Sequence, residues 1–198
     1  MEKFNKLFQE LNIELKKIDK KVDLICVGGF VLEYYSIRST IDVDAFFEND
    51  SEFNTLIKKV GDKLHANEEE LWLNNSVSNM NKKPDIGICN KVYSLSNINI
   101  YIPPIEYIIG MKASTGREKD VEDIGLLIKV LEDKKPFDLK RRVDSYGFDM
   151  DESILLEGYG NAYGLDWLVE FYKNNELSHS IEADEIENQI DEYDELSL

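Results

Sequence analysis

The chain has 198 residues, of which 42% are hydrophobic and 11% aromatic, and its formal net charge at pH 7 is −17. This length supports one compact domain, or a small α/β core with a helical appendage, and the aromatic content excludes disorder across the bulk of the chain. No apolar run approaches the roughly 18–20 residues of a membrane span, and the N-terminal segment lacks the apolar block of a secretion signal, so we expect a cytoplasmic protein with no membrane partner.

The first third of the chain predicts alternating helices and strands. Apolar residues recur at steps of three and four in some segments, which is typical of helices with one buried face, and form short continuous runs in others, which is typical of buried strands. The predicted elements are a helix over 3–19, a strand over 24–27, a helix over 30–37, a strand over 40–47 and a helix over 53–64 that Ser51 caps.

The middle of the chain, from 66 to 97, has the least clear pattern. Two brief strands are predicted over 86–89 and 98–102. Trp72 reads as a core residue, although a platform for stacking a base is the alternative.

The remainder predicts helices. Pro103-Pro104 ends the last strand and fits the start of a helix, in which Lys112 shares a face with Ile105, Ile108 and Ile109. A lysine on an apolar face must reach either water or an acid. A second helix follows from Arg117, and three more are predicted over 138–146, 151–158 and 163–175.

The acidity is concentrated at the C-terminal end. Residues 177–198 contain eight Asp or Glu and no Lys or Arg, so the other 176 residues carry 32 acids against 23 bases, a charge of −9. That balance disfavours non-specific attraction to nucleic acid. The last 22 residues read as a solvated acidic tail, with a basic protein partner as its other use.

The sequence places two carboxylates in one predicted strand. Asp42 and Asp44 are two residues apart, so in a strand they project from the same face, about 6.6 Å apart along the backbone. Ile41 and Val43 would point the other way, into the core. Two neighbouring carboxylates repel each other unless a cation lies between them, and oxygen ligands suit Mg²⁺ or Mn²⁺. The alternative is a pair of strand-end carboxylates that cap a neighbouring helix.

A glycine pair precedes these aspartates. Gly28 and Gly29 end the first predicted strand, where the missing Cβ lets a ligand approach the backbone, and the following helix offers free N–H groups to phosphate. Strand, Gly-Gly, helix, then strand with Asp-x-Asp is a more specific order than either motif alone.

This order resembles the nucleotidyltransferase superfamily, the fold shared by DNA polymerase beta, aminoglycoside nucleotidyltransferases and AbiE-type toxins. The resemblance covers about residues 23–131. It rests on Gly28-Gly29 with Arg38-Ser39-Thr40-Ile41-Asp42-Val43-Asp44, on Trp72-Leu73-Asn74, and on Glu106-Tyr107, Lys112 and Arg117-x-x-Asp120-x-x-Asp123. It implies an α+β fold with a mixed sheet core flanked by helices, and the C-terminal part lies outside the resemblance. We expect the chain to divide into a core with the N-terminal helix (1–102), a helical part that completes the cleft (103–176) and the acidic tail (177–198).

The resemblance also implies roles for individual residues. Asp42 and Asp44 would hold the Mg²⁺ ions, Gly28 and Gly29 would bind the β- and γ-phosphates of an NTP, and Lys112 would neutralise the triphosphate or the departing pyrophosphate. Asp120 would act near Lys112 or the acceptor. Arg38, Thr40 and Arg117 would contact substrate or position its loop, and Asp85 is the best candidate for a third metal-binding carboxylate.

Three functions follow from these residues. The first is Mg²⁺-dependent transfer of a nucleoside monophosphate from an NTP to a hydroxyl of a tRNA, a protein or a small molecule, with a toxin or phage-defence role by analogy. The second is an inactive nucleotide- or partner-binding protein with the same fold, and the third is a regulatory protein that binds through its tail. Arg117, Asp120 and Asp123, three residues apart, could instead form a row of surface charges on a helix.

Overall fold

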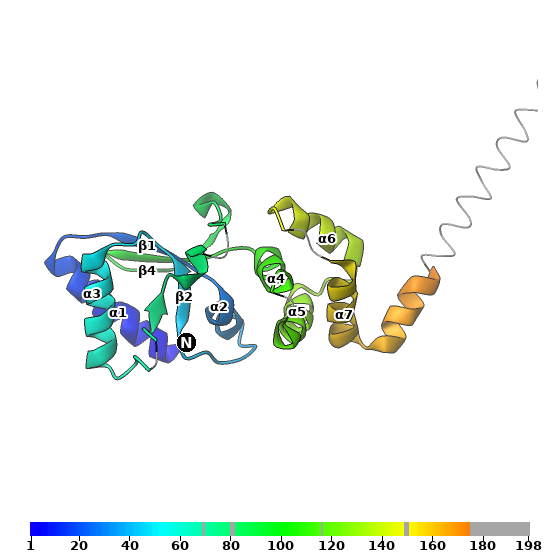
Figure 1. Ribbon diagram of the computed structural model, residues 1–198, viewed down its shortest axis with the longest axis horizontal. Coiled ribbons are helices and arrows are strands. Elements are labelled where there is room, and N and C mark those ends of the chain that lie inside the picture. Colours follow the sequence, from blue (N-terminus) through cyan, green and yellow to red (C-terminus); the bar gives the residue numbers. More distant parts are fainter. Residues whose placement is uncertain (69, 80–81, 116, 149–150, 175–198) are drawn as a thin grey trace, which may run out of the picture.

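The computed structural model describes residues 1–68, 70–79, 82–115, 117–148 and 151–174. It confirms the α+β class, because a mixed sheet with flanking helices forms one end and a group of helices the other (Figure 1). The first end contains α1 (Glu2–Lys17), β1 (Val22–Cys26), α2 (Gly28–Tyr34), β2 (Val43–Phe46), α3 (Ser51–Lys63), β3 (Leu73–Asn74), β4 (Asn90–Ser94) and β5 (Ile98–Ile102). Two 3₁₀ turns, η1 (Ser76–Asn79) and η2 (Ile86–Ile88), lie between β3 and β4.

The sheet has the order β3-β2-β1-β5-β4. β1 pairs parallel with β5 and antiparallel with β2, whereas β2 pairs parallel with β3. The buried run Leu24–Cys26 therefore occupies the centre of the sheet, as expected for a strand that is apolar on both faces. The register sets Asp44 of β2 opposite Asn74 of β3, which brings polar side chains from two strands together.

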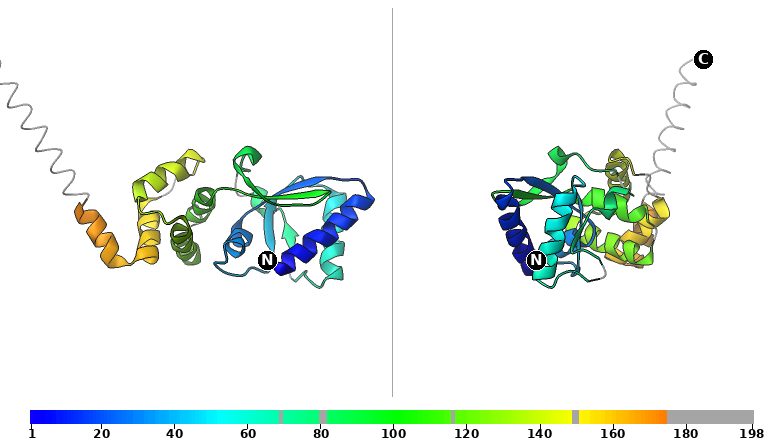
Figure 2. Two further views of the ribbon diagram at one scale, coloured as in Figure 1. Left: turned by 180° about the vertical axis from the view of Figure 1, so that it is seen from behind. Right: turned by 60° about the vertical axis from the view of Figure 1, so that its left-hand side comes forward.

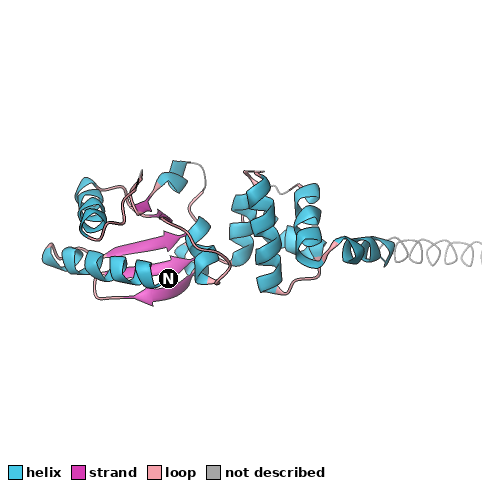
Figure 3. Cartoon of the chain, turned by 90° about the horizontal axis from the view of Figure 1, so that it is seen from below, coloured by secondary structure: helices cyan, strands magenta, loops and turns pink. Residues whose placement is uncertain are grey.

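The N-terminal helix buries the stripe that its sequence predicts. Phe4, Phe8 and Leu11 of α1 are at most 1% exposed, and the helix packs beside α3 (Figure 3). Glu14 is also buried, and its carboxylate accepts hydrogen bonds from Lys17 and from Lys59 of α3 at 2.7 Å each. Ile18 lies just beyond the helix and is exposed, so the predicted extension to residue 19 is wrong at its C-terminal end.

The predicted strand over 86–89 is also wrong. Asp85 accepts a hydrogen bond from the Gly87 N–H at 2.8 Å, which favours the 3₁₀ turn η2, and Ile86 and Ile88 are exposed. The strand β4 begins only at Asn90. A run of four residues with two branched apolar side chains was too short to separate a strand from a turn.

Two boundaries near the aspartates also differ from the prediction. The cap of α3 is Asp50, whose carboxylate accepts from the N–H groups of Glu52 and Phe53, and not Ser51. β2 begins at Val43, so Asp42 immediately precedes the strand. Val43 is buried as predicted, whereas Ile41 is 60% exposed and does not point into the core.

The part of the molecule that follows the sheet is helical. It contains α4 (Ile105–Ala113), α5 (Glu118–Leu131), α6 (Pro136–Ser145) and α7 (Glu152–Tyr163), and residues 165–174 are also helical (Figures 1 and 2). Gly125 of α5 faces Gly158 of α7 so closely that a Cβ at Gly125 would lie 3.0 Å from the Gly158 carbonyl oxygen. The two glycines therefore let these helices pack at short range.

Trp72 is a core residue, as predicted. Its side chain is 1% exposed, and its indole N–H donates to the Ile57 carbonyl at 3.0 Å. Among the described helices, none has the length and apolar character needed to cross a membrane. The acidic tail predicted over 177–198 lies outside the described residues, and the domain boundaries stay a prediction.

Candidate functional site

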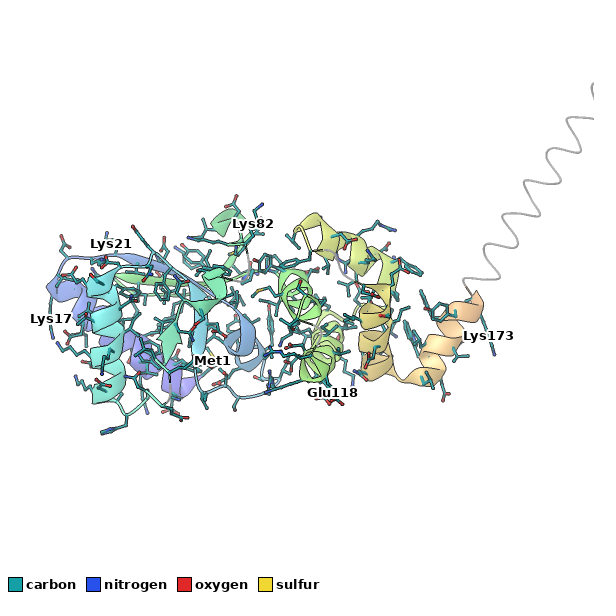
Figure 4. The ribbon with its side chains drawn as sticks, viewed as in Figure 1. Met1, Lys17, Lys21, Lys82, Glu118 and Lys173 are labelled. Carbon is teal, nitrogen blue, oxygen red and sulfur yellow. The ribbon has the colours of Figure 1, made fainter. Side chains whose placement is uncertain are left out.

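A cleft of about 570 Å³ lies where α2 and the segment before β2 meet α4 and α5. We call it the aspartate cleft. It is lined by Gly28, Gly29, Arg38, Ser39, Thr40, Ile41, Asp42, Asp44, Lys112, Arg117, Lys119 and Asp120. Side chains from the sheet-containing part and from the helical part of the molecule meet between α2 and the α4–α5 pair, near the labelled Glu118 at the start of α5 (Figure 4). The cleft brings together nine of the ten residues singled out in the sequence.

The tenth, Asp85, is not part of this cleft. Its side chain is exposed and accepts the Gly87 N–H in the turn before β4. The position beside Asp44 on the neighbouring strand is taken by Asn74, whose amide approaches Asp42 Oδ2 at 3.5 Å. The structure therefore places an amide where we expected a third carboxylate.

The glycine pair allows the aspartates to approach the start of α2. Gly28 has φ of +58°, in the left-handed region that favours glycine, and a Cβ there would lie 3.0 Å from Asp44 Oδ2. A Cβ on Gly29 would lie 2.6 Å from Thr40 Oγ1. The Val27 N–H donates to the Asp44 carbonyl at 2.9 Å, which fixes β2 against the turn. Both glycines are thus required by close contact with the carboxylate segment.

This contact leads to a first prediction. The Gly29→Ala substitution should force Thr40 away from Gly29 and displace Asp42, because Thr40 Oγ1 donates to Asp42 Oδ1 at 3.1 Å. We expect thermal unfolding to show a loss of about 1–3 kcal/mol, which is typical of overpacking. Gly160→Ala is the control, because Gly160, like Gly29, lies in a helix without a positive φ, and a Cβ added there would have its nearest neighbour, Leu168 Cδ2, at 3.9 Å. A loss for Gly29→Ala no larger than that for Gly160→Ala would contradict the contact.

Asp42 and Asp44 have only neutral hydrogen-bond partners among the described residues. Thr40 and Asn74 contact Asp42, and no Lys or Arg in the described part of the chain forms an ion pair with either aspartate. Burial raises the pKa of Asp44, the neighbouring Asp42 raises it further, and a hydrogen bond from Asn74 offsets part of the rise. The ionised pair therefore lies in an environment that a bound cation would stabilise.

The buried acids of α5, Asp120 and Asp123, do have charged partners. The Lys112 ammonium donates to Asp120 Oδ1 at 2.9 Å and to Asp123 Oδ2 at 2.6 Å, and all three residues are at most 8% exposed. The lysine on the apolar face of α4 thus reaches acids, one of the two possibilities that the sequence left open. Because an ammonium has three donors, one N–H of Lys112 remains for a group in the cleft that it lines.

Two arginines complete this network. Arg117 Nε donates to Asp120 Oδ2 at 2.6 Å, and Arg38 Nη2 donates to Asp123 Oδ2 at 2.7 Å. Asp120 and Asp123 are each 3% exposed, so the interpretation of these acids as surface charges is wrong. A signal was present in the sequence: Asp123 lies four residues before the inward-facing Leu127, and Asp120 four before Ile124.

The network predicts a dependence of stability on pH. Burial would raise the pKa of Asp120, but hydrogen bonds from Arg117, Thr115 and Lys112 outweigh it and lower the pKa from 3.8 to about 2. A depressed carboxyl pKa stabilises the fold above the unfolded-state value and loses that contribution as the pH falls through the folded value. We therefore expect the stability advantage of the unmodified chain over Asp120→Asn to shrink between pH 4 and pH 2. Thermal unfolding across that range measures it, and a constant difference would contradict the assignment.

Glu33 of α2 is a positioning residue that sequence reasoning missed. Its Oε2 accepts the Thr40 N–H at 3.0 Å, and Thr40 in turn contacts Asp42. The carboxylate of Glu33 thus anchors the segment between α2 and β2. Nothing in the sequence pattern distinguishes it from an exposed helical glutamate.

The carboxylates of Asp42 and Asp44 fit a Mg²⁺ ion that has few protein ligands. In the described part of the chain, no group of three or more His, Cys, Asp or Glu side chains is arranged to hold a metal. Mg²⁺ is commonly bound through one or two carboxylates and keeps water and substrate phosphates for its other positions. Asp42 and Asp44 supply such a pair, and basic side chains, Arg38, Lys112, Arg117 and Lys119, line the same cleft.

Comparison with known proteins gives one family. The model of a family described as "Nucleotidyltransferase of unknown function (DUF6036)" matches residues 2–139, which include every residue that lines the aspartate cleft. No curated protein and no solved structure matches the chain.

Proposed function

Because the chain belongs to this family of nucleotidyltransferases (DUF6036), we propose that the aspartate cleft transfers a nucleoside monophosphate from an NTP to a hydroxyl, with Mg²⁺ or Mn²⁺ as cofactor. The single observation that carries the proposal is the unequal pairing of the carboxylates. Asp120 and Asp123 are neutralised by Lys112 and two arginines, whereas Asp42 and Asp44, at the glycine turn, lack any such partner among the described residues.

The charge of the cleft supports an anionic substrate. Although the whole chain carries −17, the cleft lining has four basic residues against three acidic ones. The basic residues are Arg38, Lys112, Arg117 and Lys119, and the acidic residues are Asp42, Asp44 and Asp120. Asp123 pairs with Lys112 and Arg38 and balances the fourth base, so a divalent cation at Asp42 and Asp44 would give the site a net positive charge toward an anionic substrate.

The family and the lining of the cleft support the following reaction. The acceptor oxygen attacks the α-phosphorus, the bond from that phosphorus to the oxygen of the β-phosphate breaks, pyrophosphate leaves, and the acceptor proton passes to solvent. A divalent ion held by Asp42 and Asp44 would supply charge stabilisation to the phosphates. Gly28 and Gly29 offer backbone N–H groups to the phosphate chain. Lys112 and Arg117 donate to the charge that develops on pyrophosphate, so that catalysis consists of positioning and charge neutralisation.

The test is direct. The protein is incubated with each of the four labelled NTPs and Mg²⁺ or Mn²⁺, and pyrophosphate release or self-labelling is measured. The proposal expects a metal-dependent signal with at least one NTP. If no NTP gives a signal with either metal, or if the signal persists in excess chelator, the metal-dependent transfer is contradicted.

A second function, nucleotide binding without transfer, is favoured by one observation. Asn74, and not a carboxylate, lies in register with Asp44, and Asp120, the third acid of the cleft lining, is held in ion pairs with Lys112 and Arg117 and is not free to activate an acceptor hydroxyl. Metal-dependent NTP binding without pyrophosphate release, in the presence of varied hydroxyl acceptors, would support this second function.

The biological setting is a further part of the proposal. The resemblance to AbiE-type enzymes supports a toxin or phage-defence role for the transfer reaction. The eight acids of residues 177–198 support a basic protein partner. Removing residues 177–198 should weaken capture of such a partner and leave the pyrophosphate signal intact.

A further inference from the structure

A second cavity adjoins the aspartate cleft behind Asp44. It has a volume of about 220 Å³ and lies between the end of β1, η1 and α4. We call it the Met111 cavity. It shares Gly28, Asp44, Lys112, Arg117 and Asp120 with the aspartate cleft, so the two spaces are contiguous.

The walls that belong to this cavity alone are mostly apolar. Val27, Val77 and Ile108 are buried side chains from three different segments, and Met111 is half-buried. Ser76 and Thr115 are the exposed hydroxyl side chains among the lining residues, and the Thr115 hydroxyl donates to the Lys112 carbonyl at 2.8 Å. Sites for uncharged ring systems have this composition, with an apolar lining and few polar groups, and the thioether of methionine packs favourably on aromatic rings.

Another cavity adjoins the aspartate cleft on the side of Asp42. It has a volume of about 260 Å³ and shares only Ile41 and Asp42 with the cleft. Its other charged lining residues are Glu68 and Glu70, and its lining has no Lys or Arg. An α-phosphate at that junction would meet carboxylates without a base, whereas at the junction with the Met111 cavity Lys112 and Arg117 lie beside Asp44 and Asp120.

We propose that the Met111 cavity binds the nucleoside of the NTP, with the base packed against Met111 and Val77 and the triphosphate extending past Lys112 into the aspartate cleft. This inference rests on the proposed function, because it needs an NTP in the cleft. It assigns the uncharged part of the substrate to the apolar space and keeps the first phosphate between the basic residues that the two spaces share.

The test separates the nucleoside from the phosphates. Met111→Trp fills the cavity without changing any charge, and binding of ATP, GTP, CTP, UTP and inorganic tripolyphosphate is measured by calorimetry in the presence of Mg²⁺. We expect the affinity for the preferred NTP to fall about tenfold or more, since base packing on a side chain contributes that much to binding, while the affinity for tripolyphosphate stays unchanged. Val77→Phe, on η1, fills the same cavity from another segment and should give the same pattern.

The control is Leu165→Trp, which places the same large ring on a side chain that is 72% exposed and outside both cavities. Retained tripolyphosphate binding also shows that each variant is folded. Unchanged NTP affinity in both cavity variants, or equal losses for NTP and tripolyphosphate, would overturn the nucleoside site. Failure of the unmodified protein to bind either ligand would instead contradict the proposed function.

Discussion

Replacing Asp42 and Asp44 together with Asn should lower the rate of pyrophosphate release by about 10³-fold or more, because a metal ion contributes several kcal/mol to charge stabilisation in the transition state. The substitution keeps the shape of both side chains and removes only their charge. The raised pKa of Asp44 means that its ionised form disfavours the folded state at neutral pH, so the double variant should unfold at the same temperature as the unmodified chain or higher. Activity and stability should therefore change independently.

The matched control is Asp85→Asn. Asp85 was the third carboxylate that the sequence suggested, but its side chain lies in an exposed turn outside the aspartate cleft. We expect this variant to keep full activity. A loss of activity for Asp85→Asn, or activity that survives the double change at Asp42 and Asp44, would show that the reacting centre lies elsewhere.

Lys112→Met should have the largest effect on stability. It removes the ammonium that contacts both Asp120 and Asp123 in a site that is at most 8% exposed, and it leaves two buried carboxylates with one arginine each. Breaking a buried ion pair from one side is strongly destabilising, so we expect the free energy of unfolding to fall by about 3–5 kcal/mol. Chemical denaturation at neutral pH measures this difference.

Lys119→Met is the control for that experiment. Lys119 lines the same cleft, and its substitution removes the same charge, but its side chain is exposed, so we expect a change within about 0.5 kcal/mol. Equal effects of the two substitutions would mean that the buried ion network does not hold α4 and α5 together.

The elements that the sequence predicted well are those with a strong local pattern. The apolar stripe of 3–19 and the inward residues Ile124, Leu127 and Ile128 gave helices close to the observed α1 and α5. The order Gly28-Gly29, then Asp42 and Asp44, gave most of the candidate site, because each motif is contiguous and its spacing fixes which residues share a face.

The parts that were missed depend on contacts between distant segments. Arg38 pairs with Asp123, which lies 85 residues later in the sequence, and no periodicity in either segment indicates that the two side chains are in contact. The pairing of Asn74 with Asp44 depends on the register of β3, a strand of only two residues. The strand predicted over 86–89 was wrong for the opposite reason. There a single local hydrogen bond, from the Gly87 N–H to the Asp85 carboxylate, favours a turn over a strand.

Binding of Mn²⁺ tests the central claim most directly, because it needs no knowledge of the acceptor. Electron paramagnetic resonance counts the Mn²⁺ bound by the unmodified chain, by Asp85→Asn and by the double variant of Asp42 and Asp44, each with residues 177–198 removed so that the acidic tail does not contribute. We expect the double variant to bind fewer ions than the other two by about one per chain, and Mg²⁺ to displace that ion. Equal binding by all three proteins would contradict a metal site at Asp42 and Asp44, and with it the proposed transfer reaction.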